Sequence, residues 1–191
     1  MEQNDVLDLY RQTGAYLEGH FRLSSGLHSP GYMQSALVLQ RPADAASLGQ
    51  GIAAHVNSVR PTVVLSPALG GLIIGHEVAR ALGVRSIFAE RAGGTALTLR
   101  RGFTLSPGDR VLVVEDVFTT GKSTRETMEV ARDAGARVVG VAALVDRSGG
   151  TIDFGVPSYA LVSLEVPTYE PEKCPLCAEG IPVVKPGSRP T

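Results

Sequence analysis

The sequence has little of what marks secreted or membrane proteins. It contains only two cysteines, Cys174 and Cys177, which form one C-x-x-C and are too few for a disulfide framework. No stretch reaches the roughly 18 apolar residues that a membrane-spanning helix needs. The first residues, M-E-Q-N-D, are acidic and polar and lack the pattern of a signal peptide. We therefore expect a cytoplasmic chain without a membrane partner.

Charge is also scarce, and lysine in particular. Charged residues make up 19% of the chain and the formal net charge is −1. The chain therefore has no basic field of the kind that attracts DNA or RNA, and we expect no nucleic-acid partner. A small anion held by local groups is compatible with this balance. The only lysines are Lys122, Lys173 and Lys185, so most of the positive charge is arginine.

Apolar runs rich in Val and Leu alternate with segments of helical periodicity. The runs cover residues 63–65, 84–88, 111–114, 138–145 and 159–164, and helices are expected at 4–13, 42–57, 70–82 and 123–134. This alternation predicts an α/β fold with a mostly parallel sheet covered by helices on both faces. Because such sheets bind ligands at the carboxyl ends of their strands, we expect functional residues just after Leu65, Phe88, Val114 and Val145.

The two ends of the chain have a different character. Within residues 20–39, short apolar runs flank Ser- and Gly-containing turns, which predicts small antiparallel strands. From Pro167 onward the chain is rich in proline, which predicts an irregular tail. With 191 residues, 43% of them hydrophobic, we expect one domain over 1–166, including a small N-terminal hood formed largely by 14–40, and a C-terminal tail over 167–191.

The segment after Val114 carries the most chemical information. Glu115 and Asp116 follow a buried strand, and a hydroxyl-rich loop (119–123) then leads into a helix. A helix N-terminus has unsatisfied N–H donors and a partial positive charge, which suit a phosphate, and Gly121 allows close approach of the backbone. Carboxylates beside a phosphate repel it unless a group lies between them. A ribose is such a group, so the acids and the loop together predict a ribose 5-phosphate site.

Two other interpretations fit part of this segment. Gly121-Lys122-Ser123 matches the end of a nucleotide-binding P-loop, G-x-x-x-x-G-K-[ST]. The position of its opening glycine, however, is Asp116, whose charge would face the triphosphate. The segment also fits a capped helix after a buried strand, with a solvated Glu-Asp pair. We favour the ribose-phosphate site because it uses both the acids and the loop.

Residues 113–123, V-V-E-D-V-F-T-T-G-K-S, resemble the phosphoribosyl pyrophosphate (PRPP) signature of the type I phosphoribosyltransferases. Four further segments resemble the orotate branch of that family. Residues 21–30 resemble its hood, 66–71 its pyrophosphate loop, 88–91 the start of its mobile catalytic loop, and 144–147 a strand end with an orotate-binding arginine. The resemblance implies the type I fold and transfer of ribose 5-phosphate from PRPP to orotate. The products would be pyrophosphate and orotidine 5'-monophosphate, in pyrimidine (UMP) biosynthesis.

The resemblance also implies how PRPP is held. Glu115 and Asp116 would bind the ribose diol, and the loop from Thr119 to Ser123 would bind the 5-phosphate. Asp116 and Arg91 are the implied catalytic residues. Mg2+ would be held mainly through PRPP, with no metal bound by the protein alone, and a homodimer would share its active-site loops across the interface. The implied PRPP contacts are Glu115, Asp116, Val117, Phe118, Thr119, Thr120, Gly121, Lys122, Ser123 and Arg91.

For orotate, the resemblance implies contacts from Thr119, Arg147 and Ser25. A planar guanidinium suits a carboxylate, which supports Arg147 on physical grounds. Two structural alternatives stay open: Arg147 pairs with a neighbouring aspartate, Asp146 or Asp153, or the segment around Ser25 is a plain hairpin turn.

The loop after Arg91 departs from the family pattern. Many orotate enzymes carry lysines and a histidine there, whereas residues 92–101 contain neither and the loop is shorter. Gly70 and Ser24 also stand where many relatives have a lysine. These differences fit either a loss of catalysis or a short-loop subgroup in which an arginine supplies the charge, and we favour the second. The candidates are Arg91, Arg100 and Arg101.

Three points stay open at this stage. A purine or uracil phosphoribosyltransferase is a rival, although Arg147 favours a carboxylated base. A PRPP-sensing regulator is another, but no DNA-binding helix-turn-helix precedes residue 20 and the net charge is −1. Cys174-x-x-Cys177 is half of a typical zinc site without two further ligands nearby in the sequence. Either a second pair comes from another chain, or the cysteines are free thiols in a tight turn around Pro175.

Overall fold

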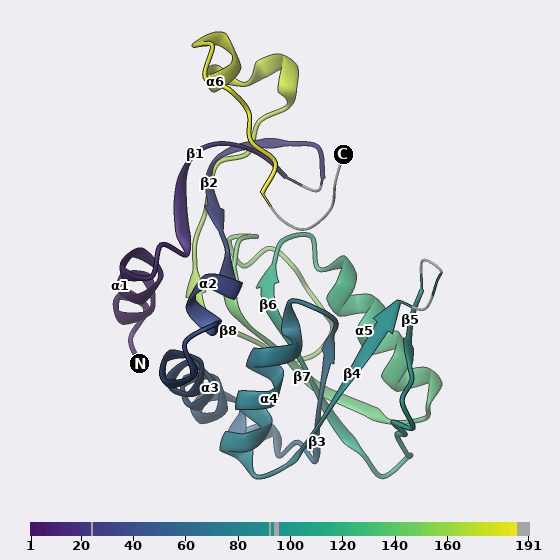
Figure 1. Ribbon diagram of the computed structural model, residues 1–191. Helices are drawn as coiled ribbons and strands as arrows, with labels where there is room; N and C mark the ends of the chain where they lie inside the picture. The colour runs from purple at the N-terminus through teal and green to yellow at the C-terminus, as the bar shows by residue number, and fades with distance from the viewer. Residues whose placement is uncertain (24, 92, 94–95, 187–191) are drawn as a thin grey trace.

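A six-stranded sheet forms the centre of the molecule, with strand order β5-β4-β3-β6-β7-β8 (Figure 1). The computed structural model describes residues 1–23, 25–91, 93 and 96–186. Neighbouring strands are parallel except β4 and β5, which are antiparallel. The strands are β3 (Val63–Pro67), β4 (Arg85–Arg91), β5 (Leu97–Leu99), β6 (Arg110–Phe118), β7 (Arg137–Asp146) and β8 (Ser158–Ser163).

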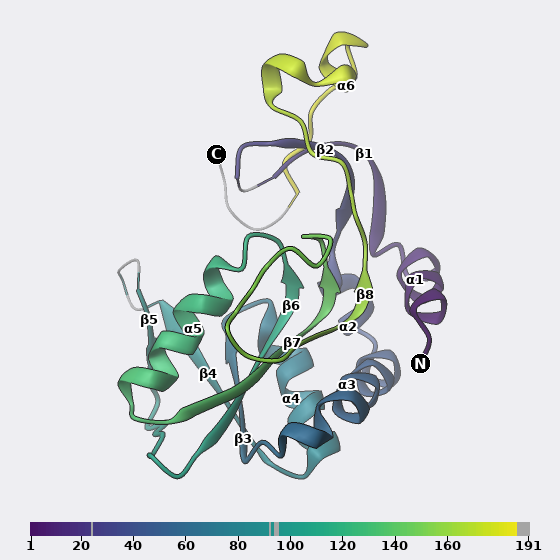
Figure 2. The same cartoon turned by 180° about the vertical axis from the view of Figure 1, so that it is seen from behind.

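Helices cover both faces of the sheet (Figures 1 and 2). Because successive strand residues point to opposite faces, Leu112 and Val114 of β6 join one core with α1, α3 and α4, while Val111 and Val113 join another with α5. All four side chains are fully buried. No helix in the described part of the chain is long and apolar enough to cross a membrane. The helices are α1 (Gln3–Gln12), α2 (Ser35–Leu39), α3 (Pro42–Val56), η1 (Asn57–Val59), α4 (Gly71–Leu82) and α5 (Lys122–Asp133).

The predicted α/β fold is confirmed, with two differences. Strand β5 lies in a stretch that we had assigned to a loop, because three residues with one polar centre give no detectable strand pattern. Strand β6 does not end at Val114 but continues to Phe118, and Glu115 pairs with Ala143 of β7. The two acids are therefore fixed by the sheet ladder rather than carried on a free loop.

The hood and the C-terminal tail lie together above the carboxyl edge of the sheet (Figure 1). The hood hairpin consists of β1 (Tyr16–Arg22) and β2 (His28–Met33), which are antiparallel as expected. The tail contains two short helical turns, η2 (Pro171–Lys173) and α6 (Pro175–Ala178). It pairs with both hood strands through isolated bridges, Phe21 with Val184 and His28 with Tyr169. The tail is thus attached to the hood, whereas the domain boundary at residue 166 stays a prediction.

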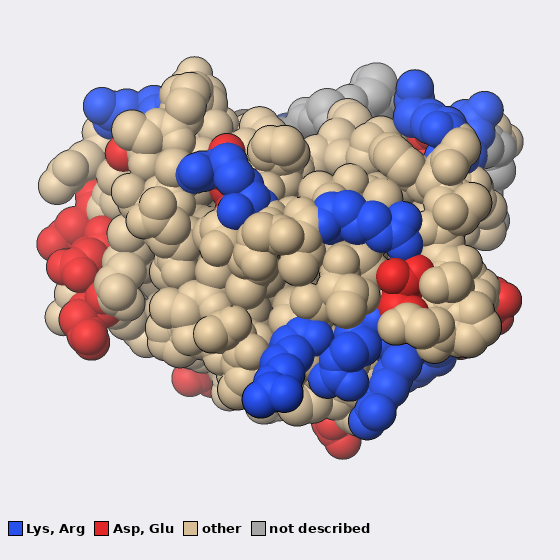
Figure 3. Space-filling model, turned by 90° about the horizontal axis from the view of Figure 1, so that it is seen from below, with Lys and Arg blue, Asp and Glu red and all other residues tan. Residues whose placement is uncertain are grey.

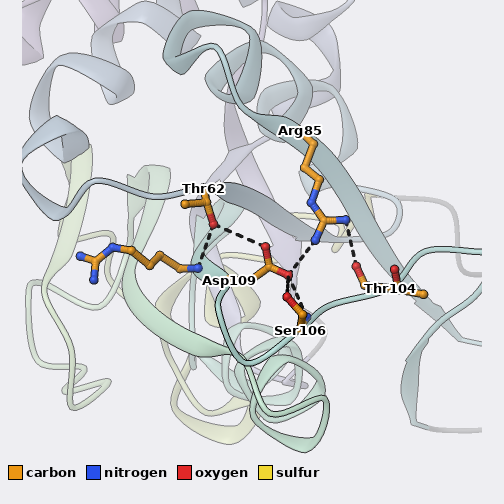
Figure 4. Close-up of polar contacts among 6 residues, drawn as sticks. Thr62, Arg85, Thr104, Ser106 and Asp109 are labelled. Carbon is orange, nitrogen blue, oxygen red and sulfur yellow. Dashed lines mark hydrogen bonds and ion pairs between the residues drawn. The ribbon is translucent and has the colours of Figure 1, made fainter.

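An ion-pair network joins the amino ends of the strands, opposite the hood (Figure 4). Asp109 Oδ2 accepts hydrogen bonds from Arg85 Nη2 at 2.8 Å and from the backbone N–H of Ser106 at 2.8 Å. Asp109 Oδ1 contacts the Thr62 hydroxyl at 3.5 Å, and Thr62 in turn accepts from the Arg110 N–H. The network therefore ties the loops before β3, β4 and β6 to one carboxylate.

Arginine side chains gather on the same end of the molecule, seen from below in Figure 3. Arg85, Arg110 and Arg137 begin three strands, and Arg60 precedes a fourth. The Arg110 guanidinium donates to the backbone carbonyls of Val59 and Arg60 at 2.7 and 2.9 Å. Arginines here thus satisfy loop carbonyls and stabilise the fold.

Replacing Asp109 with asparagine should lower the free energy of unfolding by roughly 1–3 kcal/mol, the usual cost of losing hydrogen bonds to a charged group. Burial opposes ionisation of Asp109, but the bonds from Ser106 and Arg85 outweigh it and hold its pKa below the ordinary value. The stabilisation is complete above the unfolded pKa, about 3.9, and is lost as the pH falls through the folded pKa. Urea unfolding between pH 3 and pH 7 measures both effects.

The exposed Asp133, at the end of α5, provides the matched control, because Asp133→Asn should change neither stability nor its pH dependence. Equal stability of Asp109→Asn and the unchanged protein at neutral pH would contradict the role of the network.

Candidate active site

The carboxyl ends of four strands converge on one cavity of about 310 Å3 beneath the hood. Such a volume lies at the lower end of the range for small-ligand pockets, about 300–1,000 Å3. The residues that follow the parallel strands, where we expected functional side chains, lie together in the cavity wall. The wall contains Pro67 and Ala68 from the end of β3, Arg91 from β4, Glu115, Asp116, Val117 and Thr119 from β6 and its loop, and Arg147 after β7.

Glu115 and Asp116 form an acidic pair in this wall. Burial and the neighbouring Asp116 raise the pKa of Glu115 well above its ordinary value, and burial likewise raises the pKa of Asp116. Their oxygens are held in place: Ser123 Oγ donates to Glu115 Oε2 at 2.7 Å, and the Val117 N–H donates to Asp116 Oδ1 at 2.9 Å. A ligand that offers hydroxyl donors, or positive charge, would be stabilised here.

The loop between β6 and α5 presents a helix N-terminus to the same region. Its cap residue, Gly121, provides no side-chain cap, and the first backbone N–H of α5, that of Lys122, reaches the Thr120 hydroxyl only at 3.4 Å. Thr119 and Ser123 line the cavity, and Thr120 and Lys122 line the adjoining groove. The Lys122 side chain is 81% exposed, with its Nζ 4.0 Å from Glu126. This arrangement suits an anion such as a phosphate.

Gly121 and Phe118 set the shape of the loop segment. Gly121 has φ +72°, and a Cβ at this position would lie 2.9 Å from the ring of Phe154, so no larger residue fits without displacement. Phe118 is 1% exposed and stacks at 5.0 Å, in a tilted arrangement, on Phe154. The Phe118 side chain does not line the cavity, and its backbone carbonyl accepts a hydrogen bond from the Arg147 N–H at 2.8 Å.

Arg147 lines the same cavity, and its charge has no ion-pair partner among the described residues. Its Nη2 makes only long contacts, 3.4 Å to Ser29 Oγ and 3.4 Å to the Gly31 carbonyl. Its Nε is buried without a hydrogen-bond partner in the described structure. Burial lowers the pKa of this guanidinium, yet arginine stays protonated in proteins. A partly buried cation without a counter-charge is unfavourable, so the position favours an anionic ligand.

The alternative of an ion pair with a neighbouring aspartate is wrong. Asp146 accepts hydrogen bonds from Ser148 and Gly150, and Asp153 accepts from the Gly155 N–H. Among the described residues, no carboxylate lies within 4.0 Å of the Arg147 guanidinium.

The three candidate loop arginines have different positions. Arg91 lines the cavity and forms an ion pair with Glu126 of α5. Arg101 forms a two-pronged pair with Glu90 at 2.9 and 3.1 Å, and Arg100 lies 3.8 Å from the same carboxylate. Glu90 and Arg91 are adjacent in a strand, so their side chains point to opposite faces. Of the three, Arg91 alone lines the cavity. The loop expected to be mobile falls partly on residues 92 and 94–95, outside the described residues.

The segment that resembles a pyrophosphate loop packs directly against the acids. A Cβ at Gly70 would lie 2.8 Å from Asp116 Oδ1, and one at Gly71 would lie 2.8 Å from the Val114 carbonyl. The peptide bond between Ala68 and Leu69 is cis. A lysine at position 70 is therefore incompatible with the present position of Asp116, which gives a steric reason for the glycine.

The hood provides a wall of the cavity that the sequence did not reveal. Leu23, Tyr32, Met33 and Gln34 line it, although nothing in their pattern separates them from ordinary strand residues. Ser25, which we expected at the orotate position, is exposed in the hairpin turn and lines the adjoining groove instead. Ser24 lies outside the described residues.

Cys174 and Cys177 have two further candidate ligands in the same chain, an arrangement that we did not consider from the sequence. His20 and His28 lie beside them, and the ligand atoms of all four side chains are within 4.8 Å of one another. The histidines are distant in sequence and reach the cysteines because the tail folds back onto the hood strands.

Comparison with known proteins gives the same assignment for the whole chain. Residues 39–160 match the family model described as phosphoribosyl transferase domain. The orotate phosphoribosyltransferase of Pelotomaculum thermopropionicum is 54% identical over 189 residues, 99% of each chain, and that of Heliobacterium modesticaldum is 54% identical over 191 residues, 99% of this chain and 100% of the relative.

Solved structures agree. Orotate phosphoribosyltransferase from Aeropyrum pernix superposes with a TM-score of 0.71 at 28% identity, over 84% of this chain and 94% of that one. The Mycobacterium tuberculosis enzyme in complex with PRPP gives 0.66 at 26% identity, over 85% and 96%. With the cavity, the acid pair and the phosphate-type loop in the expected places, the chain belongs to the orotate phosphoribosyltransferase family.

Proposed function

We propose that this cavity transfers ribose 5-phosphate from PRPP to orotate, giving orotidine 5'-monophosphate and pyrophosphate for pyrimidine biosynthesis. One observation carries the assignment of the base: the half-buried guanidinium of Arg147, which has no ion-pair partner among the described residues and a buried Nε without a hydrogen bond, lines the cavity that also contains the acid pair and the loop at the start of α5. Among nucleobases, orotate brings a carboxylate, which a planar guanidinium binds with two parallel hydrogen bonds.

PRPP fits the remaining groups of the cavity. In the proposed complex, the loop from Thr119 to Ser123 and the α5 N-terminus hold the 5-phosphate, and Glu115 and Asp116 accept hydrogen bonds from the ribose 2'- and 3'-hydroxyls. The bond from the anomeric carbon to the pyrophosphate oxygen breaks, and a bond to the orotate nitrogen forms from the opposite face. Positive charge on the ribose during this exchange is favoured by the two carboxylates.

The negative charge that leaves with pyrophosphate needs a cation, and Arg91 is placed to provide one. Its guanidinium lines the cavity and pairs with Glu126, a contact that a more highly charged pyrophosphate would displace. Arg100 and Arg101 instead bind Glu90. We therefore assign the role of the usual loop lysine to Arg91.

Mg2+ is part of the proposal. Carboxylate oxygens are ligands that Mg2+ accepts, usually with several of its waters retained, and Asp116 is the cavity carboxylate next to the loop expected to face pyrophosphate. When bound, chiefly through PRPP, the ion would neutralise charge on the leaving group. The homodimer with shared loops remains a prediction from the family resemblance, and the cytoplasmic location remains a prediction from the sequence.

The assay that tests the function mixes purified protein, PRPP, Mg2+ and orotate and follows orotate absorbance, with adenine, hypoxanthine, xanthine and uracil in parallel. We expect loss of orotate only when PRPP and Mg2+ are both present. Turnover of another base instead would remove the orotate assignment. PRPP binding without turnover of any base would favour a PRPP-sensing regulator.

Arg147→Ala should raise the KM for orotate by roughly 10–100-fold, because the carboxylate loses hydrogen bonds worth about 1.5–3 kcal/mol. The KM for PRPP should change little, since the Arg147 side chain is not among the groups proposed to hold PRPP. Arg137→Ala, at the exposed far end of the same strand, is the matched control. An orotate KM unaffected by the loss of Arg147 would contradict its assignment.

Arg91→Ala should lower kcat at least about 100-fold, the usual effect of removing one group that stabilises developing charge. Arg101→Ala, which loses only the pair with Glu90, should retain most of the activity. If Arg101→Ala has the larger effect, Arg91 is not the missing cation.

The same variants test the shared loop. At low orotate both variants should be weak, because Arg91→Ala lowers kcat and Arg147→Ala raises the orotate KM. If Arg91 acts on the partner's site, mixing the two variants should restore activity at low orotate, because a mixed dimer contains one site with both arginines. If mixed dimers form and stay as weak as the single variants, Arg91 and Arg147 act within one chain, whose cavity both line.

A further inference from the structure

A second group of chemically active side chains lies in the hood, outside the cavity. His20 is on β1 and His28 is on β2. Cys174 directly precedes the short helix α6, and Cys177 lies within it. His20, His28 and Cys174 are 3%, 6% and 3% exposed. The cluster therefore combines two imidazoles and two thiols at the point where hood and tail meet.

The four ligand atoms face one another. His20 Nε2 lies 2.8 Å from His28 Nδ1, 3.5 Å from Cys174 Sγ and 3.7 Å from Cys177 Sγ. Cys177 Sγ lies 3.3 Å from His28 Nδ1. In a tetrahedral zinc site with bonds of about 2.1 Å to nitrogen and 2.3 Å to sulfur, neighbouring ligand atoms are about 3.4–3.8 Å apart. The sulfur–nitrogen separations match these edges, and the two imidazoles need to separate by roughly half an ångström as an ion enters.

A backbone contact prepares His20 as a ligand. Its Nδ1 lies 2.7 Å from the Ile181 carbonyl, which can only accept, so Nδ1 carries the proton and Nε2 offers its lone pair to the cluster. Metal-binding histidines commonly have such a carbonyl on their second nitrogen, which fixes the tautomer and the ring orientation. The carbonyl comes from the tail, so the tail orients a hood residue.

The tail is built around the same point. His28 exchanges two backbone hydrogen bonds with Tyr169, both 2.9 Å long, and the His20 carbonyl accepts from the Val184 N–H at 2.8 Å. The tail thus pairs with β2 at Tyr169, before the cysteines, and with β1 at Val184, after them. This convergence brings together residues about 150 positions apart in the chain.

We propose that His20, His28, Cys174 and Cys177 form a structural zinc site that fastens the C-terminal tail to the hood. Two thiolates and two neutral imidazoles balance the charge of one Zn2+, so the buried site carries no net charge. Thiolate and imidazole ligands in this number select zinc over Mg2+, which takes oxygen ligands. Four protein ligands leave no open position, which is typical of a structural role and not of a catalytic one.

The site also bears on the cavity. Ser29 follows His28 directly, and its hydroxyl is one of the two contacts of Arg147. Leu23, at the end of the strand that carries His20, lines the cavity. Zinc at this position therefore holds the hood strands from the side opposite the substrates. The zinc proposal itself does not depend on which base the enzyme uses.

Metal analysis of the full chain, purified without chelator or added metal, is the first test. We expect about one zinc per chain, and at least about a tenfold loss of bound zinc in His28→Gln and Cys177→Ser. The exposed His76 on α4 gives the matched control, since His76→Gln should retain zinc fully. Cys177 is exposed and Cys174 buried, so Cys177→Ser keeps the test usable if Cys174→Ser fails to fold.

Cobalt identifies the ligands directly. Protein depleted of metal and loaded with Co2+ should show the sulfur-to-cobalt charge-transfer band and the intense visible bands of a tetrahedral site. In Cys177→Ser, the charge-transfer band should be weaker. Hydrogen exchange should then increase on chelation within residues 16–33 and 168–186 and stay unchanged in the central sheet.

Three results would overturn the proposal. The first is wild-type protein that contains far less than one zinc per chain and, with Co2+, shows no thiolate charge-transfer band. The second is a native Cys174–Cys177 disulfide found by thiol titration. The third is equal zinc content in the wild type and in both ligand variants.

Discussion

The position of β6 decides where the chemistry takes place. This strand pairs with β3 on one side and β7 on the other, and its apolar residues are buried on both faces of the sheet. A strand fixed on all sides cannot shift or slip without exposing both cores. Glu115 and Asp116 lie on the same strand, so the packed core fixes the positions of their carboxylates. The loop that follows the strand begins α5 at a defined place.

The acid pair and Arg147 in the cavity do not form ion pairs with each other. The acids lie on one side, with the pKa of both raised by burial and that of Glu115 raised further by Asp116, and Arg147 has no carboxylate within ion-pair distance among the described residues. Neither side neutralises the other, so both keep an unfavourable solvation energy that a ligand of opposite polarity relieves. A hydroxylated sugar between an anionic phosphate and an anionic base has this polarity.

Much of this was visible in the sequence, and the limits have physical causes. The buried strands and amphipathic helices follow local periodicity, and the acids and the glycine loop occupy consecutive positions, so both were predictable. The hood wall was not, because Tyr32 and Gln34 face the cavity only through the way the hairpin sits over the sheet. Neither was the partner of the cysteines, since His20 and Cys174 meet only when the tail pairs with the hood.

The short catalytic loop and Gly70 can be understood as one structural change. A residue with a side chain at position 70 would require Asp116 to move, because its Cβ would lie 2.8 Å from Oδ1. The glycine therefore lets the pyrophosphate-side loop approach the acid pair closely, and this approach removes the space that a lysine would occupy. In the proposed reaction the cation comes from another direction, since Arg91 on β4 reaches the cavity from the strand next to β3. Because Arg91 is fixed at the end of a strand, the charge is positioned by the sheet and a long lysine-bearing loop is unnecessary.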